Sequence, residues 1–556
     1  MRLSAPLPLS DKPLSAASMS SPSTQAKRAK SASLWLLLSV HCAALRAAPR
    51  AYLVALWWRI CGKRVRARAQ FAPLLEVSPK AYALWLLRGE EAVEAGPQDR
   101  AKPPIRALID ARANQAGLDA TLRSLAGEGV PALVVGTEDC PTLLDAARRI
   151  DWSEAPWLMP LAAGDVLARG AAPAYRAAIA GAETRIVYAD DDLFDGKGRR
   201  TVPHFKPDWN SELFRHFDYL TGACVVRAPG EALEAVAAAQ DWARRIVAQA
   251  ADEGTPLHLR RVLHHRRTRP GPRALPRIVP APALPPVTAI VPTRNRVDLL
   301  RTCLDGLAAA DYPDLEMIVV DNDSDDPETL AFLAGLDPAR HRVLRHPGAF
   351  NYSTINNRAV AEARGRMLCL LNNDVEMIGA DWLAIMATQA LRDDVGAVGA
   401  QLLYPDGRIQ HAGVVTGVGR AAGHAHRFLR PDEEGYFRRH ALPQFVSAVT
   451  AACLVVARDR FLAVGGLDEQ HFAVAFNDVD LCLRLNERGW QSLYEPRATL
   501  IHHESVSRGF DRDPVGARRF AGELAALKAR WGTDERVDPF HHPELSPYSE
   551  RFVVRL

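Results

Sequence analysis

The residues with the clearest chemical potential in this sequence are the cluster Asn372-Asn373-Asp374. They follow an apolar run, Met367 to Leu371, which is typical of a buried strand. In open α/β sheets, ligands bind outside the carboxyl ends of the strands. A carboxylate with amide neighbours at such an edge therefore predicts a site for a metal ion and phosphate, although a polar turn would also explain this run taken alone.

Two other predicted strands also end in polar residues. Val287 to Val291 leads into the loop Pro292-Thr293-Arg294-Asn295-Arg296, after which residues 297–309 have helical spacing. A loop that precedes a helix start offers backbone N–H groups and an arginine to an anionic ligand. The strand 316–320 ends in Asp321. Because a carboxylate would repel phosphate, we expect Asp321 to accept hydrogen bonds from a base or ribose.

Three further features depend on helix ends and on a histidine pair. The acidic run Asp323 to Asp326 is expected to cap the next helix. Asp478 lies near the start of a predicted amphipathic helix, where the dipole favours the ionised form that a general base requires; a helix cap is the competing interpretation. His502 and His503 end an apolar run and could supply a neutral imidazole to a metal held by Asp374.

The strands and helices that must position these residues occur in two copies along the chain. Gly136 and Ala162-Ala163 stand in the first copy where the second has Asp321 and Asn372-Asn373. We therefore expect two βα-layered domains of common design, the first mainly structural or acceptor-binding. The matching segments are 121–125 leading to 132–136 with 302–307 leading to 317–321, 158–165 with 368–374, and 222–227 with 451–456.

Composition limits the class of protein. The 556 residues are 48% hydrophobic and 24% charged, which is ordinary for a globular chain of three or four domains. A net charge of +4 gives no case for a nucleic-acid binder. The eight cysteines show no metal-finger spacing, and most of them are expected to be reduced core residues of a cytoplasmic protein.

Basic residues are concentrated near the N-terminus, where they alternate with tryptophans and leucines. The longest uncharged piece, Ser31 to Leu45, is shorter than the roughly 20 residues that span a bilayer. A signal peptide is not expected either, because a long polar segment comes first. Two interpretations stay open: a segment that lies on an anionic membrane surface, and a packed helical hairpin.

Taken together, the motifs in the second half resemble a family 2 glycosyltransferase with the GT-A fold. The resemblance is closest to the bacterial branch that builds O-antigen and other surface polysaccharides, including rhamnosyltransferases. Residues 188–209 and 258–266 also resemble a shortened N-terminal GT-A-like domain of two-domain members. The motifs are 292–295, 320–322, 372–374, 465–469, 477–480 and 502–503.

The resemblance implies a role for each matching residue. Asp374 would bind a divalent cation, Mg²⁺ or Mn²⁺, although the usual pair of carboxylates is reduced to one by Asn372-Asn373. One of His502 and His503 would approach that metal. Asp478 would be the catalytic base, with Asn477 in place of the usual Glu. The implied nucleotide-binding residues are Pro292, Thr293, Arg294, Asp321, Asn372 and Asn373.

The implied reaction is inverting transfer of a sugar from a nucleotide-diphosphate sugar to a glycan or lipid-linked saccharide. The expected location is cytoplasmic, with peripheral contact at the inner face of the membrane. Two alternatives stay open: a catalytically inactive sugar-binding scaffold, and an oxidoreductase suggested by the glycine-rich run 417–423. The expected divisions are a disordered segment 1–30, a basic and aromatic helical segment 31–95, a truncated GT-A-like domain 96–275, a proline-rich linker 276–286, a catalytic GT-A domain 287–546 and a tail 547–556.

Overall fold

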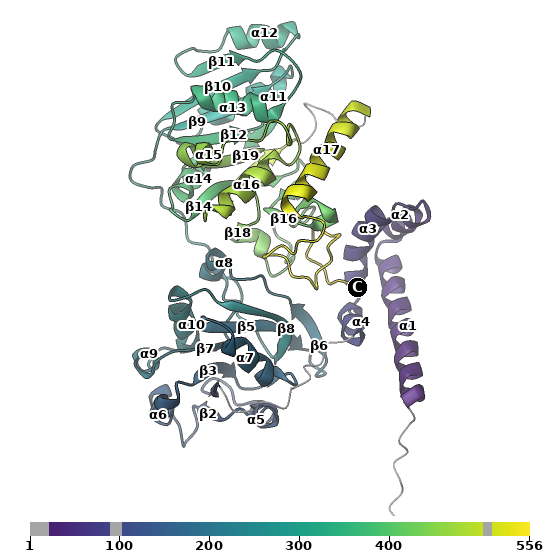
Figure 1. Cartoon of the computed structure of the whole chain (residues 1–556), viewed down its shortest axis with the longest axis vertical. Helices are drawn as coiled ribbons and strands as arrows, with labels where there is room; N and C mark the ends of the chain where they lie inside the picture. Colours follow the sequence, from purple (N-terminus) through teal and green to yellow (C-terminus); the bar gives the residue numbers. More distant parts are fainter. Residues whose placement is uncertain (1–21, 89–102, 504–513) are drawn as a thin grey trace, which may run out of the picture.

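The computed structural model describes residues 22–88, 103–503 and 514–556. Two α/β sheets lie one above the other, and a helical segment stands beside them (Figure 1). The expectation of two α/β domains is confirmed.

The sheet of the second domain contains parallel and antiparallel strands. Apolar residues that alternate along its strands pack into two hydrophobic cores, one on each face of the sheet. Val287, Ala289 and Val291 face one core, whereas Ile290 faces the other. This period of two is expected when both faces of a sheet are covered. The strand order is β11 (His341–Arg345), β10 (Leu315–Asp321), β9 (Val287–Thr293), β12 (Met367–Leu371), β19 (Cys453–Ala457), β14 (Val395–Leu403), β20 (Gln491–His502) and β13 (Val375–Met377), with β15 (Ile409–His411) on β14 and β18 (Gln444–Val446) on β20.

Helices pack on both faces of this sheet. Leucines of α11 and the buried side of α14 form one core, and α13, α15 and α16 contribute to the other. The helices of the first group are α11 (Val297–Ala308), α12 (Pro327–Ala334) and α14 (Trp382–Ala390). Those of the second group are α13 (Tyr352–Glu362), α15 (Arg458–Ala463) and α16 (Asn477–Glu487).

Strand register brings the predicted functional residues to one edge. β9 runs parallel to β10 and β12, and Thr293 is the register partner of Asp321. The carboxyl ends of the three strands therefore lie side by side. β13 pairs antiparallel with β20, with Val375 opposite His502, so Asp374 comes beside the end of β20.

The first domain repeats this topology. Its strand order is β2 (Ala132–Val135), β1 (Ile105–Asp110), β3 (Trp157–Ala162), β7 (Cys224–Val226), β5 (Ile186–Phe194), β8 (Leu257–Arg266) and β4 (Val166–Leu167), with β6 (Arg200–His204) on β5. Strand for strand, the order and the directions match β10, β9, β12, β19, β14, β20 and β13. The three segment matches seen in the sequence fall on corresponding elements, so the internal repeat is confirmed.

The first domain is the shorter copy. Its described strands include no counterpart of β11, since a single helix, α6, links β2 to the β3 region. Its helices are α5 (Leu118–Gly127), α6 (Leu143–Arg148), α7 (Ala171–Ala180), α8 (Ser211–His216), α9 (Gly230–Ala235) and α10 (Trp242–Asp252). Residues 267–286 form an irregular connection to the second domain.

The N-terminal segment is helical, and its first helix begins earlier than the sequence suggested. The helices are α1 (Pro22–Ala47), α2 (Pro49–Ile60), α3 (Arg64–Glu76) and α4 (Ala81–Leu87). α1 thus starts at Pro22, inside the stretch 1–30 that was expected to be disordered, and proline is well tolerated in a first helical turn. Residues 1–21 and 89–102 lie outside the described residues.

The C-terminal segment fills the space between the domains. After α17 (Pro514–Trp531) the chain is irregular, yet Leu545, Phe552 and Val554 are buried. They share a core with Phe205 of the first domain and Val415 of the second. The residues after 546 are therefore packed between the two domains and do not project from them.

The glycine-rich run that suggested an oxidoreductase has a different structure. β16 (Val414–Thr416) and β17 (Ala422–His424) pair antiparallel, and Gly417 with a short 3-10 turn at Val418–Arg420 joins them. A dinucleotide loop leads from a strand into a helix, so this alternative is wrong.

Candidate active site

A cavity of about 780 Å³ lies at the carboxyl edge of β9 and β12. We call it the edge cavity. It contains eight of the predicted site residues and excludes Asp321 and His503. The lining residues are Pro292, Thr293, Arg294, Asn295, Arg296, Asp325, Phe350, Tyr352, Asn372, Asn373, Asp374, Thr450, Ala451, Ala452, Val474, Asn477, Asp478, His502 and Arg519.

The loop after β9 is held in a strained conformation by its neighbours. Asn295 and Arg296 have φ angles of 53° and 55°, in the left-handed region that few side chains adopt. The carbonyl of the Asn295 side chain accepts hydrogen bonds from the backbone N–H groups of Asp325 (3.0 Å) and Asp326 (3.1 Å). Strain of this kind persists where surrounding contacts enforce it, and it is concentrated at functional sites.

Arg294 is the cation of this loop that is available to a ligand. It is exposed, lines the edge cavity, and makes no hydrogen bond or ion pair within the described chain. Arg296, by contrast, pairs with Asp298 at 2.7 Å. A guanidinium at the mouth of a cavity suits an anionic oxygen donor such as phosphate.

The amides after β12 connect the strand ends. The Asn373 side chain donates a hydrogen bond to the Thr293 hydroxyl at 3.0 Å. Asn372 Nδ2 lies 3.4 Å from His502 Nε2 and is oriented to donate to it. Both asparagines thus fix the relative positions of β9, β12 and β20 around the cavity.

Asp374 and His502 face one another in an arrangement that a cation would satisfy. His502 Nδ1 lies 2.6 Å from Gln410 Oε1 and must donate its proton there, because a carbonyl oxygen only accepts. Nε2 then carries a lone pair in the neutral ring, and it lies 3.1 Å from Asp374 Oδ1. Either a second proton or a shared divalent cation resolves this contact, so the donor set fits a metal ion.

His503 does not reach the edge cavity. Its Nε2 lies 3.0 Å from Glu376 Oε2 on β13, and its backbone N–H donates to the Asp374 carbonyl at 3.0 Å. Successive strand residues point to opposite faces, so only one of the two histidines can face Asp374. Of the two histidines that the resemblance left open, the geometry places His502, and not His503, next to Asp374.

Asp478 lies in the first turn of α16 and lines the edge cavity, as expected from the sequence. It is half-buried, and it accepts hydrogen bonds from the backbone N–H groups of Ala451 (3.1 Å) and Val479 (2.8 Å). Burial raises the pKa of Asp478, while these bonds and one from Thr450 oppose the rise. A raised pKa makes a carboxylate a stronger proton acceptor.

Asp321 is buried next to Thr293 but does not line the cavity. One carboxylate oxygen accepts from Ser324 N–H at 3.0 Å, and the other is paired with Arg345. Both oxygens are thus engaged, so the expected contact with a base or ribose would require Arg345, whose side chain is 56% exposed, to move away.

The other acidic residues have structural roles. Asp326 caps α12 by accepting from Thr329 N–H at 2.9 Å, which confirms the expected helix cap. Asp480 is fully buried and pairs with Arg484 and with Arg530 of α17, each at 2.8 Å.

Sequence reasoning missed the contribution of α17. Its Arg519 lines the edge cavity. Its buried Glu523 accepts hydrogen bonds from the backbone of Val474 (2.8 Å) and Ala475 (3.2 Å), which immediately precede α16. Nothing local in the sequence marks these residues, because only the fold brings α17 across the end of α16.

In the first domain, arginines contact Asp165, the residue that matches Asp374. Asp165 precedes β4 as Asp374 precedes β13, and its Oδ1 accepts from the backbone N–H of Arg267 at 3.0 Å. Arg266 lies 3.6 Å from its other oxygen. The Arg267 side chain packs directly over Gly117 and Gly164. A cation supplied by the protein thus replaces the one that Asp374 could bind.

A base is also missing from this copy. α10, the counterpart of α16, begins Trp242-Ala243 where α16 begins Asn477-Asp478. The buried Trp242 instead donates from its indole nitrogen to Asp110 at 3.1 Å.

One other cluster within the described residues has three possible metal ligands, namely Asp190, His258 and His542. The backbone N–H of Glu544 donates to His542 Nδ1 at 3.0 Å, so a neutral His542 carries its proton on Nε2, 3.0 Å from Asp190. His258 lies 3.1 Å from both Asp190 and Asp208. Protons therefore account for these contacts, and we interpret the cluster as a buried ion-pair network between the domains.

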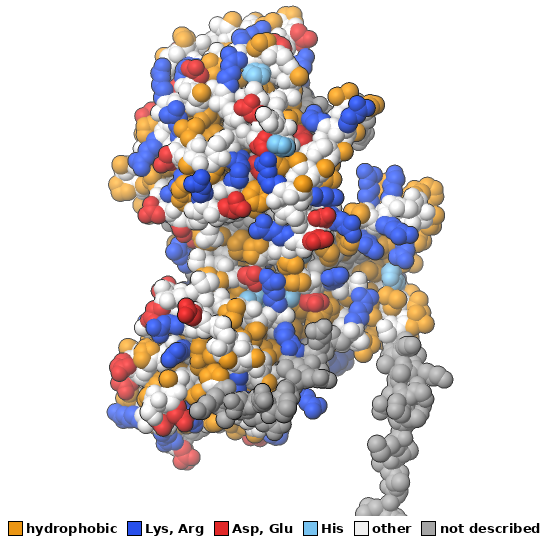
Figure 2. Space-filling view, viewed as in Figure 1, with side chains coloured by type: hydrophobic (Ala, Val, Ile, Leu, Met, Phe, Trp, Pro, Cys, Tyr) orange, Lys and Arg blue, Asp and Glu red, His pale blue; other side chains and the backbone are white. Residues whose placement is uncertain are grey.

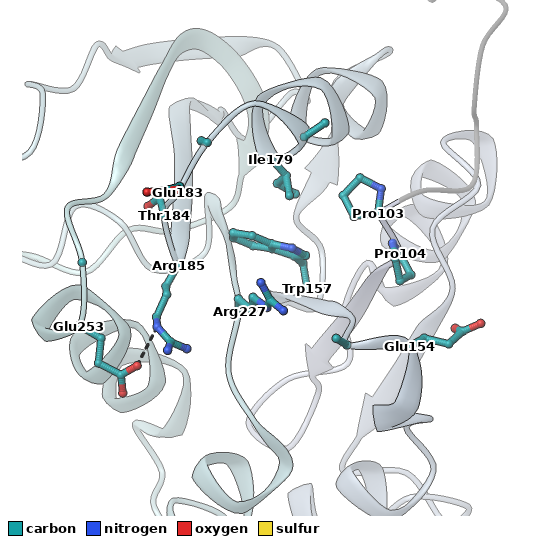
Figure 3. Close-up of a pocket in the computed structure, with 14 residues that line it drawn as sticks. Pro103, Pro104, Glu154, Trp157, Ile179, Glu183, Thr184, Arg185, Arg227 and Glu253 are labelled. Carbon is teal, nitrogen blue, oxygen red and sulfur yellow. Dashed lines mark ion pairs between the residues drawn. The ribbon is translucent and has the colours of Figure 1, made fainter.

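A second hollow, of about 1360 Å³, opens on the opposite edge of the first domain (Figure 3). Trp157 and Arg227 lie on its wall, and Arg185 pairs with Glu253 at 2.8 Å. It contains no paired carboxylates or imidazoles, and its rim at Pro103 adjoins a stretch outside the described residues. We therefore take the edge cavity as the candidate active site.

Comparison with known proteins assigns the second domain to a class. Residues 288–452 match the family Glycosyl transferase family 2. This segment contains the predicted nucleotide-binding residues and Asp374, whereas Asp478 and His502 lie beyond it.

Curated relatives extend the similarity into the first domain. The chain is 38% identical over 421 residues to the uncharacterized protein y4gI of Sinorhizobium fredii, covering 67% of this chain and 46% of that one. It is 35% identical over 412 residues to the O-antigen biosynthesis protein RfbC of Myxococcus xanthus, covering 66% and 32%. The chain thus spans less than half the length of these two relatives.

Another relative and one solved structure match a smaller part of the chain. An N-acetylglucosaminyl-diphospho-decaprenol L-rhamnosyltransferase of Mycobacterium tuberculosis is 28% identical over 235 residues, covering 39% of this chain and 75% of that one. A mannosyltransferase from Pyrobaculum calidifontis, solved with GDP-Man and Mn²⁺, shares 20% identity and covers 48% and 70%, with a TM-score of 0.35. Similarity at that TM-score supports no argument about the ligands of this chain.

Proposed function

We propose that this protein is an inverting glycosyltransferase that moves a sugar from a nucleotide-diphosphate sugar to a growing cell-surface glycan or a lipid-linked acceptor. The observation that carries the proposal is the edge cavity. It places Asp374 with His502, the free Arg294 and the candidate base Asp478 around one space. The family match over residues 288–452 and the relatives named for O-antigen biosynthesis and rhamnosyl transfer support it.

The chain supplies binding groups for a diphosphate at one side of the cavity. Arg294, which is exposed and lines the cavity, presents positive charge and guanidinium N–H groups to phosphate oxygens. Asp374 and His502 would hold a divalent cation, Mg²⁺ or Mn²⁺, which when bound neutralises charge on the diphosphate leaving group.

The chain also supplies a proton acceptor, Asp478, which lines the same cavity. Asp478 accepts the proton of an acceptor hydroxyl while that oxygen bonds to the anomeric carbon, and the bond from this carbon to the diphosphate oxygen breaks. The nucleoside diphosphate departs with the bonding electrons, and attack from the opposite face inverts the anomeric configuration. Base catalysis of this kind contributes about 10²–10⁴-fold.

The substitution Asp478→Asn tests the assignment of the base. It keeps the shape of the side chain and one accepting oxygen but removes the proton acceptor; because both carboxylate oxygens accept backbone N–H bonds, the melting temperature of the variant is measured as well. Turnover of a nucleotide sugar should fall about 10²–10⁴-fold, while donor affinity measured by calorimetry changes little. Asp459→Asn is the matched control, because Asp459 also lies in the first turn of a helix but is exposed and outside the cavity. Near-normal turnover of the Asp478→Asn protein would remove Asp478 from the mechanism.

A catalytically inactive sugar-binding scaffold is the second candidate. It is favoured by Asn372-Asn373 and Asn477, which stand where the family resemblance leads us to expect carboxylates. A panel of nucleotide sugars, with dTDP-rhamnose first, separates the enzyme from the scaffold when each sugar is tested with and without Mn²⁺ or Mg²⁺. An enzyme hydrolyses its own donor slowly in the presence of metal, whereas a scaffold shows only a raised melting temperature.

A further inference from the structure

Helices α1 to α3 turn large apolar side chains outward. More than half of the exposed large apolar side chains of the described residues lie in the segment 33–88. Figure 2 shows hydrophobic and basic side chains intermingled over these helices. An exposed apolar surface of this extent on a folded protein normally marks an interaction site.

On α2 the large apolar side chains are exposed, whereas an ordinary surface helix buries them. Leu53, Trp57 and Ile60 are spaced three or four residues apart and therefore share one face, and they are 57%, 61% and 72% exposed. The inward face carries the small Ala55, which is fully buried. The core of the helical segment is small, built on Ala55, Ala67 and Phe71. The largest apolar groups of α2 thus contribute little to the fold itself.

The charge of this segment is equally one-sided. Residues 22–88 contain twelve lysines and arginines and a single acidic residue, Glu76, although the whole chain carries a net charge of only +4. Arg59, Lys63 and Arg64 lie beside the apolar face, at the end of α2 and the start of α3, and all three are exposed. A second copy of the chain would bring the same positive charge to this face and would be repelled.

We propose that the outward face of α1, α2 and α3 docks on an anionic lipid bilayer, with Leu53, Trp57 and Ile60 inserted at the level of the headgroups. Interleaved tryptophan, leucine and basic side chains are the composition of helices that lie in a membrane interface. No helix within the described residues is long and apolar enough to cross a membrane. Docking on one leaflet is therefore the mode of binding that these helices support.

The docking helices are attached to the rest of the molecule directly and through α4, since Arg68 of α3 donates to Tyr548 at 2.7 Å and Lys80, just before α4, donates to Ser39 of α1 at 2.9 Å. Tyr82 of α4 donates to Asp192 of the first domain at 2.7 Å, and Trp85 donates to Glu544 of the C-terminal segment at 2.7 Å. A bilayer bound to α1–α3 would therefore hold both domains in one orientation. The proposal does not depend on sugar transfer, and an Asp374→Ala protein should bind lipid as the wild type does.

Two exposed cysteines allow a direct test with the full chain. Cys42 and Cys61 are exposed, whereas the other six cysteines are buried. A Cys42→Ser protein labelled at Cys61 with an environment-sensitive fluorophore reports on the end of α2. Vesicles of phosphatidylcholine with phosphatidylglycerol should shift the emission to the blue and carry the protein in flotation, and vesicles of phosphatidylcholine alone should not. Added salt should weaken the binding.

Two sets of variants separate the apolar and the electrostatic contributions. Replacing Trp57 and Ile60 by serine should lower partitioning into anionic vesicles by about tenfold or more for each side chain. Replacing Arg59 and Arg64 by serine should lower it by about fivefold each. Leu462→Ser is the matched control, because Leu462 lies on α15 and is 53% exposed. All variants should melt at the wild-type temperature, since the replaced side chains are exposed.

Three results would overturn the proposal. The first is equal flotation of the Trp57→Ser, Ile60→Ser double variant and the Leu462→Ser control. The second is equal binding to neutral and anionic vesicles. The third is blue-shifted emission of the Cys61 label before any lipid is added, which would show that the face is already covered. Light scattering would then show whether a second copy of the chain covers it.

Discussion

At the scale of single residues, the most informative contact is the one between Asp374 and His502. A carboxylate oxygen and an imidazole nitrogen lie 3.1 Å apart, and the other ring nitrogen is committed to Gln410. The neighbouring histidine, His503, points instead to Glu376. Adjacent residues of one strand thus have separate environments, and the pair offers a matched test of the metal site.

We expect His502→Gln to weaken divalent-dependent donor binding by about tenfold or more, because it removes an imidazole from the cation. His503→Gln should leave this binding unchanged. Calorimetric titration of donor at several Mn²⁺ concentrations measures both effects. Equal losses in the two proteins would show that the histidine pair acts on the fold and not on the metal.

At the scale of elements, α17 determines how the start of α16 is held. Buried Glu523 accepts two backbone hydrogen bonds from the segment that leads into α16, and Arg530 pairs with the buried Asp480. These contacts connect the C-terminal helix to the element that carries Asp478. The position of the candidate base therefore depends on a helix that follows it by more than twenty residues in the sequence.

Glu523→Gln should destabilise this arrangement, since one of the two accepting oxygens becomes an amide donor that faces an N–H group. Hydrogen bonds to a charged group are worth about 1.5–3 kcal/mol, so the free energy of unfolding in urea should fall by about that amount. Turnover should fall with it, because the segment 474–475 loosens beside Asp478. Glu535→Gln, at an exposed position just after α17, is the control and should change neither quantity.

At the scale of the whole molecule, two domains of the same topology differ in chemistry. The first copy places arginines at Asp165, whereas the second leaves Asp374 facing a histidine and a cavity. A buried hydrogen bond also connects the first domain to the C-terminal segment, since Nε2 of His542 lies 3.0 Å from Asp190. We infer that the first domain supports the second and does no transfer itself.

Substitutions at the matching residues Asp165 and Asp374 should affect different properties, the stability in one copy and donor binding in the other. Asp165→Asn should lower the free energy of unfolding by about 1–3 kcal/mol, because the buried Arg266 loses a carboxylate partner, and should leave metal-dependent donor binding intact. Asp374→Ala should abolish that binding and all sugar transfer. Residual transfer by the full-length Asp374→Ala protein would show that the first domain is active.

The stability of the buried cluster around Asp190 in the first domain should depend on pH through His258. Burial lowers the pKa of His258, but Asp190 and Asp208 outweigh it and the net pKa is raised. Other groups that face this cluster are the imidazole of His542 at Asp190, the Arg260 guanidinium at Asp208 and the buried Lys206 near Asp190. A raised folded pKa stabilises the protein fully below the unfolded value of about 6.5, and the stabilisation is lost as pH rises through the folded pKa.

Between about pH 6 and pH 8, the wild type should therefore lose more unfolding free energy than a His258→Gln protein does. Urea unfolding at both pH values measures the difference. His341→Gln, whose ring contacts only a backbone carbonyl among the described residues, is the control. A His258→Gln protein with the wild-type pH dependence would exclude this histidine as the titrating group.

The sequence by itself determined which residues end the strands of the second domain. Apolar runs followed at once by Asn372-Asn373-Asp374 or by Pro292-Thr293-Arg294 locate a sheet edge, because strand burial and strand termination are local properties. The repeat of the two domains was also visible, since the corresponding strands and helices keep their order and their apolar pattern. The start of α16 at Asn477 followed from the same local signals.

Only the tertiary structure decided which of these residues meet. The pairing of β13 with β20 places His502 beside Asp374 and leaves His503 at Glu376. Arg345 of β11 pairs with Asp321 of the neighbouring strand β10. The contributions of Gln410, Arg519 and Glu523 arise from segments far apart in the chain. Such contacts depend on strand register and helix packing, which are set by the whole core. A local sequence pattern carries no information about a partner that lies a hundred residues away.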